Sequence, residues 1–166
     1  MTKIIKYSTC YIFVIILCAL SASACSSSNA SVVTRADINE AYQSWTKAID
    51  TANGDPSKIV ALYADNAVLM PMLSDKMLTS KSQITDYFKK FTSYKNITVS
   101  TKKFNVQAYG DIAVANGTYT FYYLGKHDKS ESVEARFTFV YQKAGGDKWL
   151  IVSQHSSVLP DENKIK

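Results

Sequence analysis

Arg136 is the first of the few side chains in this sequence that are suited to binding chemistry. Its guanidinium stays charged and offers a planar fork that matches a carboxylate. It lies in the run 133–142, where Val, Ala, Phe and Tyr residues alternate with polar ones. Such alternation is typical of a half-buried strand, so the pattern taken alone places Arg136 among the solvated side chains.

The two histidines are the next candidates. His155 is predicted to lie on the same strand face as Trp149 and Ile151, where a lone histidine is more often structural than catalytic. His127 lies in the polar loop 126–129, and we expect it to be solvated. Two histidines without acids placed nearby do not make a usual zinc site, and no His-Glu-x-x-His spacing exists. We therefore predict no metal ligands.

Aromatic residues are frequent, with 11 tyrosines and two tryptophans. Tyr119, Phe121 and Tyr123 share one face of a predicted strand, and Trp45 lies on the first predicted helix. The ordinary interpretation is core packing or a dimer interface, because aromatic side chains dominate both. The alternative is a pocket with aromatic walls and orienting hydroxyl groups, in which Tyr119 and Trp45 would contact a ligand.

Acid–base pairs are scarce. Glu134 is close to Arg136 in sequence, and Asp65 is expected to form a turn before the first strand. No two carboxylates stand at a spacing that would drive their pKa values apart, and no phosphate-binding, nicotinamide or flavin motif is present. We predict no catalytic residue and no cofactor.

Residues 1–24 are predicted to be a signal peptide. Lys3 and Lys6 precede an apolar run over 11–20, and small residues 21–24 lead to Cys25. The apolar run is shorter than the roughly 20 residues that a membrane-spanning helix needs. Removing these 24 residues, which hold two lysines and no acid, leaves 142 residues and lowers the formal charge from +5 to +3. With its lysines spread out, the remaining chain is not predicted to bind nucleic acid.

All three cysteines, Cys10, Cys18 and Cys25, lie in or next to this signal. A nucleophilic cysteine, a cysteine-ligated zinc and a disulfide are therefore excluded from the folded domain. Cys25 follows the small residues directly and precedes a polar, serine-rich stretch, which is similar to a bacterial lipoprotein signal. We expect a lipid on Cys25, a tether over 25–33 and location in the cell envelope; the alternative is simple secretion after cleavage at Ala24.

The remaining sequence predicts helices first and strands after. Apolar spacing predicts a helix from Thr34, which forms an approximate capping box with Asp37, to the stop at Asn53-Gly54. A short helix near 56–63 and a brief strand over 67–71 follow, and a third helix begins after a capping box of Ser80 and Gln83. The segments 97–109, 112–124, 132–142 and 149–157 read as strands joined by short turns. Asn116-Gly117 is a hairpin signal inside the second of these, but we predict one long strand with a glycine bulge. The fold class is therefore α+β, a strongly curved antiparallel sheet packed with three N-terminal helices.

The C-terminal third resembles the association domain of calcium/calmodulin-dependent protein kinase II, and is more similar still to its free-standing bacterial relatives. The resemblance rests mainly on the sequences of residues 135–143 and 147–152, on His155-Ser156-Ser157 and on Pro160. It extends over about residues 34–160, followed by a polar tail over 161–166. It implies a nuclear transport factor 2-like cone around a pocket, assembled as a homodimer or larger ring.

The resemblance also implies roles for single residues. The arginine matching Arg136 points into the cone, where it can meet a small carboxylate. Bacterial relatives carry two adjacent histidines where this chain has Gln154-His155, which raises interest in His155. Kinase activity is not implied, because the association domain has no catalytic machinery, and the helices here are not basic enough on their polar faces for calmodulin.

We therefore expect an exported, non-catalytic domain that self-associates and binds a small ligand through Arg136, Tyr119, His155 and Trp45. The alternative is a cofactor-independent isomerase, dehydratase or hydrolase that uses the same pocket.

Overall fold

The computed structural model describes residues 33–161. The predicted signal peptide and Cys25 lie outside these residues, as do nearly all of the predicted tether and tail. The elements in chain order are α1 (Arg35–Asp50), α2 (Ser57–Val60), β1 (Tyr63–Met70), α3 (Lys81–Phe91), β2 (Lys95–Tyr109), β3 (Ile112–Leu124), the 3-10 helix η1 (Lys126–Asp128), β4 (Ser130–Lys143) and β5 (Trp149–Val158). The strands form one sheet in the order β1-β5-β4-β3-β2, in which the pairs from β5 to β2 are antiparallel. The prediction of an antiparallel sheet is wrong for β1, which runs parallel to β5 because α3 and three further strands separate the two in the chain.

The two longer helices begin at the predicted capping boxes. The Thr34 hydroxyl accepts a hydrogen bond from the Asp37 backbone N–H at 3.2 Å, and the Asp37 carboxylate accepts one from the Thr34 N–H at 2.8 Å. Ser80 and Gln83 make the same reciprocal pair at the start of α3. Each box satisfies two backbone donors that the first helical turn leaves without an intrahelical partner.

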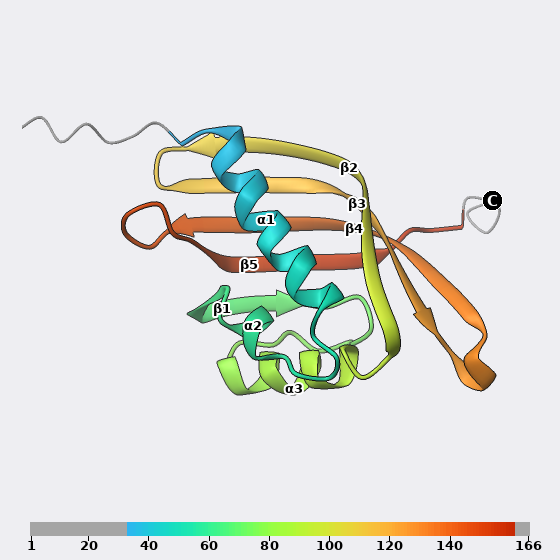
Figure 1. Cartoon of the computed structure of the whole chain (residues 1–166). Helices are drawn as coiled ribbons and strands as arrows, with labels where there is room; N and C mark the ends of the chain where they lie inside the picture. Colours follow the sequence, from blue (N-terminus) through green and yellow to red (C-terminus); the bar gives the residue numbers. More distant parts are fainter. Residues whose placement is uncertain (1–32, 162–166) are drawn as a thin grey trace, which may run out of the picture. The chain divides into compact units, whose positions relative to one another are not determined.

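The core lies between the helices and one face of the sheet, here called the inner face. In Figure 1, α1 crosses the strands while α2 and α3 lie beside β1. The inner face of β3 and β4 is buried and mostly aromatic or small: Ala113, Ala115, Tyr119, Phe121, Ala135, Phe137, Phe139 and Tyr141. Against it α1 places the buried rings of Tyr42 and Trp45, which contact Phe137 and Phe139 at centroid distances of 5.2 and 5.1 Å.

Both ends of α1 are tied to strand β2 by side-chain hydrogen bonds. Arg35 Nη2 donates to the Phe104 carbonyl at 3.0 Å, and the Asp50 carboxylate accepts from the Val99 N–H at 2.8 Å. These side chains satisfy two backbone groups of β2, whose sheet partner β3 lies on its other side.

Strand β3 runs unbroken through Asn116-Gly117, which confirms the predicted long strand. The irregularity that we predicted at the glycine lies instead in β2, where the register shifts between Thr101 and Lys103. A Cβ atom at Gly117 would lie 1.9 Å from the Lys103 carbonyl oxygen and 2.7 Å from Cζ of Phe137. Glycine is therefore needed at position 117 because the backbone of β2 approaches too closely for any side chain.

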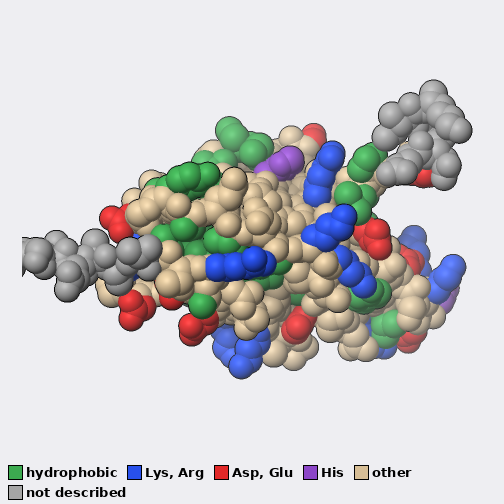
Figure 2. All heavy atoms as spheres, turned by 90° about the horizontal axis from the view of Figure 1, so that it is seen from above, with side chains coloured by type: hydrophobic (Ala, Val, Ile, Leu, Met, Phe, Trp, Pro, Cys, Tyr) green, Lys and Arg blue, Asp and Glu red, His purple; other side chains and the backbone are tan. Residues whose placement is uncertain are grey.

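Charged side chains of both signs lie on the face drawn in Figure 2. Seen from above, Lys and Arg side chains are interspersed with Asp and Glu, and no continuous stripe of one sign crosses this face (Figure 2). This view is in keeping with the solvated surface expected from the dispersed lysines.

Replacing Gly117 with Ala is expected to lower the free energy of unfolding by about 2 kcal/mol, because the methyl group forces β2 away from β3. Gly125→Ala is the matched control, since its Cβ would meet only the end of the flexible Glu131 side chain. Urea unfolding followed by circular dichroism measures both. An equal decrease in the free energy of unfolding in the two variants would show that the close approach of the Lys103 carbonyl does not destabilise Gly117→Ala.

Candidate functional site

The interior of the domain holds a cavity between α1, α3 and the inner face, with a volume of about 10 Å³. That is about the space of one water molecule. Its walls are mostly aromatic, and they include two of the predicted ligand-binding residues, Trp45 and Tyr119, each only 1% exposed. The remaining lining residues are Leu69, Pro71, Met72, Tyr87, Phe88, Phe91, Phe121, Gln154 and Ser156.

Four polar side chains of the cavity wall, those of Trp45, Tyr119, Gln154 and Ser156, are hydrogen-bonded. Trp45 Nε1 donates to the Tyr63 hydroxyl at 3.0 Å, and that hydroxyl donates to the Gln154 side-chain oxygen. The Tyr119 hydroxyl forms a hydrogen bond of 2.6 Å with the Ser156 hydroxyl. Both sets join a helix or an inner strand to β5, so they position the cavity walls while they satisfy buried polar groups.

Burial holds the cavity phenols in their neutral form. Desolvation raises the pKa of Tyr63 well above its usual range, although the hydrogen bond to Trp45 opposes the shift. Desolvation likewise raises the pKa of Tyr119, against the opposing hydrogen bond from Ser156. A phenol with a raised pKa is a poor base near neutral pH. No charged side chain lines the cavity among the described residues, so the arrangement can orient a neutral polar group but offers no acid–base pair.

The structure separates the four predicted ligand-binding residues. Trp45 and Tyr119 line the cavity, whereas Arg136 and His155 are exposed on the opposite face of the sheet, here called the outer face. The Arg136 Nε–H donates to the Ser157 hydroxyl at 2.9 Å. The expectation that Arg136 points into the cone is therefore wrong, and the simple alternation of its strand gives its orientation correctly.

His155 was also assigned to the wrong face. It was expected beside Trp149 and Ile151, which are buried, but a register shift between β4 and β5 at Val140 and Tyr141 inverts the alternation of β5. Gln154 and Ser156 consequently point inward and His155 points outward. A bulge depends on the pairing of two strands, so the pattern of one strand does not reveal it.

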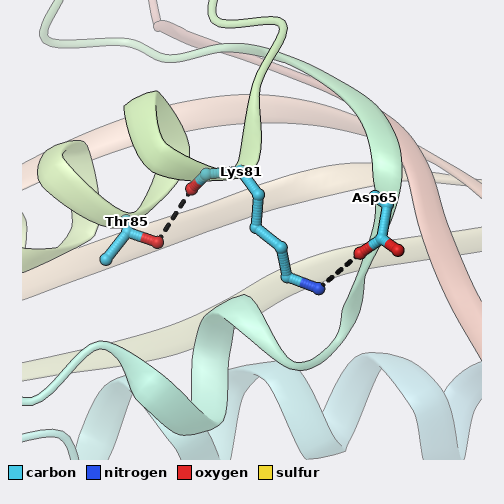
Figure 3. A network of polar contacts seen from close by, with 3 residues as sticks. All are labelled: Asp65, Lys81 and Thr85. Atoms are coloured by element: carbon cyan, nitrogen blue, oxygen red, sulfur yellow. Dashed lines mark hydrogen bonds and ion pairs between the residues drawn. The ribbon is translucent and has the colours of Figure 1, made fainter.

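Asp65 is not the turn residue that we expected. It lies within β1, and its carboxylate accepts a hydrogen bond from Lys81 Nζ at 2.7 Å, while the Lys81 carbonyl accepts one from the Thr85 hydroxyl (Figure 3). The bond from Lys81 lowers the pKa of the Asp65 carboxyl. Asp65 is exposed and ion-paired and does not line the cavity, so it is not placed to act there.

Sequence reasoning missed Tyr63, Gln154 and Ser156 as members of the buried network. Gln154 and Ser156 stand two positions apart in β5, so the sequence does indicate that they share one strand face. It does not indicate that this face points inward, because the register shift reverses the alternation that begins at Trp149. Tyr63 was placed at the end of a helix, whereas it begins β1.

Metal-binding clusters and membrane-spanning helices are both absent from the described residues. Among residues 33–161, no three His, Cys, Asp or Glu side chains gather as a candidate metal centre. Within the same part of the chain, no helix combines the length and apolar character needed to cross a bilayer.

Replacing Tyr141 with Phe should raise the free energy of unfolding by about 1 kcal/mol at pH 8, because its buried hydroxyl has no hydrogen-bond partner among the described residues. Burial also raises the pKa of Tyr141 well above its usual range, so the unfolded chain loses that proton first. The folded state therefore loses stability as the pH rises above about 10, and Tyr141→Phe should reduce this slope by up to about 1.4 kcal/mol per pH unit.

Tyr109→Phe is the control for this prediction, since Tyr109 is 62% exposed. It should leave the stability at pH 8 unchanged. Urea titrations at several pH values between 8 and 11 measure the stability and its alkaline slope. A Tyr141→Phe variant that behaves like Tyr109→Phe would contradict the role of burial.

Comparison with protein families matches residues 34–160 to the calcium/calmodulin dependent protein kinase II association domain. Comparison with curated proteins found no match.

Solved structures with the same fold are numerous. A Xanthomonas campestris protein named after the calcium/calmodulin dependent protein kinase II association domain is 36% identical, with a TM-score of 0.69 over 75% of this chain and 87% of that one. A nuclear transport factor 2-like superfamily protein from Salmonella enterica is 20% identical, with a TM-score of 0.66 over 76% and 92%. A nuclear transport factor 2-like protein of unknown function from Pseudomonas putida is 23% identical, with a TM-score of 0.66 over 81% and 94%. The last two show the fold alone.

Proposed function

Because the chain belongs to the calcium/calmodulin-dependent protein kinase II association-domain family, within the nuclear transport factor 2-like superfamily, we propose that it is a non-catalytic self-association module. In this proposal the helices close the bent sheet into a cone, two or more copies meet through the outer face of the sheet, and a lipid on Cys25 holds the exported protein at the cell envelope.

The observation that carries this proposal is a row of three valines and one serine on the outer face, where none of the described helices packs. The Cα register aligns Val114 with Val140, Val140 with Ser153, and Ser153 with Val68 across four adjacent strands. These four residues, here called the valine row, are half-buried within one copy of the chain. An antiparallel sheet with one face in water normally places polar side chains on that face. The valine row departs from that pattern, and apolar side chains gathered on an exposed face are typical of a protein–protein interface.

The surroundings of the valine row resemble the rim of an interface. The next row toward the η1 end contains Asn116 and Thr138, whose side chains are joined by a hydrogen bond of 3.0 Å. A short apolar centre with a hydrogen-bonded polar margin is the usual composition of a protein interface. A sheet face can meet its own copy about a two-fold axis, because the same residues then supply both sides of the contact.

The state of the interior favours assembly over catalysis. The cavity has about the space of one water molecule, burial raises the pKa of Tyr119, and the polar groups of Trp45, Tyr119, Gln154 and Ser156 are hydrogen-bonded. An isomerase or dehydratase needs a pocket for its substrate and a base with a pKa near the working pH. The lining residues supply neither, so no observation favours the enzyme alternative.

The predicted small carboxylate is not part of this proposal. A buried carboxylate needs a cation or several hydrogen-bond donors beside it. The two candidate side chains Arg136 and His155 lie on the outer face, away from the cavity. Binding of a carboxylate by either of them stays a prediction.

Replacing Val140 with Glu should convert the oligomer to a monomer, because a carboxylate at the centre of the contact is desolvated without a partner. Native mass spectrometry and light scattering report the size of the assembly. Gln43→Glu, an exposed change on α1, is the control and should leave the assembly intact. Near-ultraviolet circular dichroism separates loss of assembly from loss of folding, and Val114→Lys provides a second, independent disruption. A monomeric parent protein, or an assembly unchanged in both valine variants, would contradict the proposal.

The lipid anchor is tested separately in a bacterial host. The parent chain should enter the membrane fraction with the mass of a diacylated or triacylated Cys25, whereas Cys25→Ser should accumulate as soluble or unprocessed protein. Ser26→Ala leaves the cysteine in place and is expected to behave like the parent. An unmodified Cys25 in a soluble mature protein would contradict the proposed lipid anchor.

A further inference from the structure

The segment between β1 and α3 brings together three methionines within eight residues. Met70 ends β1, Met72 follows after Pro71, and Met77 precedes the buried Leu78. Together with Met1 they are all the methionines of the chain. Met70 is 41% exposed and Met77 is 59% exposed, although large apolar side chains are usually buried. This exposure calls for an explanation.

A small backbone bridge aligns two of these methionines. Leu69 and Leu78 form an isolated antiparallel pair, with N–H to carbonyl hydrogen bonds of 2.9 Å in both directions. Both leucine side chains are buried, so the next pair of residues along this bridge, Met70 and Met77, lies opposite and faces outward. Directly opposed residues of this kind have Cβ atoms about 4.5–5.5 Å apart.

The same row continues to a histidine on the other side of β1. Met70 pairs with His155 in the parallel ladder between β1 and β5, and His155 is exposed on the outer face. Met77, Met70 and His155 therefore stand side by side on three neighbouring backbone segments. We call them the soft-ligand row.

The members of the soft-ligand row share one open groove. Met70, Met72, Met77 and His155 all line a groove of about 420 Å³ on this side of the molecule. The only charged residues in its lining are Asp75 and Lys76, whose formal charges cancel. The groove thus presents three thioethers and an imidazole in a locally neutral setting.

This set of ligands matches one class of metal ion. Thioether sulfur is a soft ligand that selects Cu(I), and imidazole nitrogen binds copper as well. Hard ions such as Mg²⁺ and Ca²⁺ need several oxygen ligands, and Asp75 is the only carboxylate in the lining. We propose that Met77, Met70 and His155 form a binding site for Cu(I), with Met72 as a further thioether in the same groove. The site binds the ion without any change in its oxidation state, and all of its ligands come from one copy of the chain.

Ag(I) is the probe for this proposal, because it is a soft monovalent ion that needs no protection from oxygen. The full chain is used with Cys10, Cys18 and Cys25 each replaced by Ser, so that no thiolate competes. Methyl resonances of ¹³C-methyl methionine are followed by NMR during the titration, together with calorimetry. One equivalent of Ag(I) should shift the resonances of Met70 and Met77 and leave that of Met1 in place.

The variants identify the ligands. Met70→Leu with Met77→Leu conserves side-chain volume and should weaken Ag(I) binding by about tenfold or more, as should His155→Ala. His127→Ala is the matched histidine control and should bind like the parent. Met70 and His155 lie in the row next to the valine row, so the oligomer size of each variant is measured beside its Ag(I) affinity. Val114→Lys lies outside the soft-ligand row and should keep the Ag(I) affinity of the parent even where it disrupts the oligomer, so a failure here is distinguishable from a failure of the self-association proposal.

Three results would overturn the assignment. The first is a titration in which the Met70 and Met77 resonances do not move. The second is unchanged Ag(I) affinity in the double methionine variant, whose remaining resonances report that it is folded. The third is displacement of Ag(I) by an equal concentration of Zn²⁺, which would mean that the site does not prefer soft ions.

Discussion

The fold depends on the packing of α1 against the inner face of the sheet. Trp45 and Tyr42 enter a layer of rings from β3 and β4, with Trp45 stacked 6.1 Å from Tyr119 and Tyr42 stacked 5.2 Å from Phe137. Large rings bury much apolar surface and also fill the space between helix and sheet. In this chain the rings that stabilise the domain also occupy the space that a ligand would need. The cavity between helix and sheet is therefore small.

Because aromatic rings fill the interior, the side chains that could bind a ligand or a partner lie on the surface. The cavity keeps only neutral groups, and their hydrogen bonds lock α1 and β5 together. Arg136, His155, the valine row and the methionines lie on the outer face or at its margin. A likeness of overall fold therefore does not carry a pocket with it, because the pocket of such a sheet depends on which side chains fill the inner face.

Local signals in the sequence predicted local structure well. The Thr34 and Ser80 capping boxes, the long strand through Gly117 and the buried face of α1 all depend on neighbouring residues, and each is present. The sheet faces on which His155 and Arg136 lie were predicted wrongly, for two different reasons. His155 was inverted by a register shift that exists only when β4 and β5 pair. For Arg136 the alternation was correct, and the resemblance to the family misplaced it. The soft-ligand row requires the bridge between Leu69 and Leu78, a tertiary contact with no sequence pattern of its own.

Both free edges of the sheet are occupied by parts of the same chain. At β2, Arg35 and Asp50 from the ends of α1 take up the Phe104 carbonyl and the Val99 amide, and at β1 the backbone of Leu78 takes up both hydrogen-bonding groups of Leu69. A foreign strand that approached either side would have to displace these contacts before it could extend the ladder. These contacts disfavour open-ended polymerisation through the sheet edges, so the self-association proposed for the outer face would give assemblies of finite size.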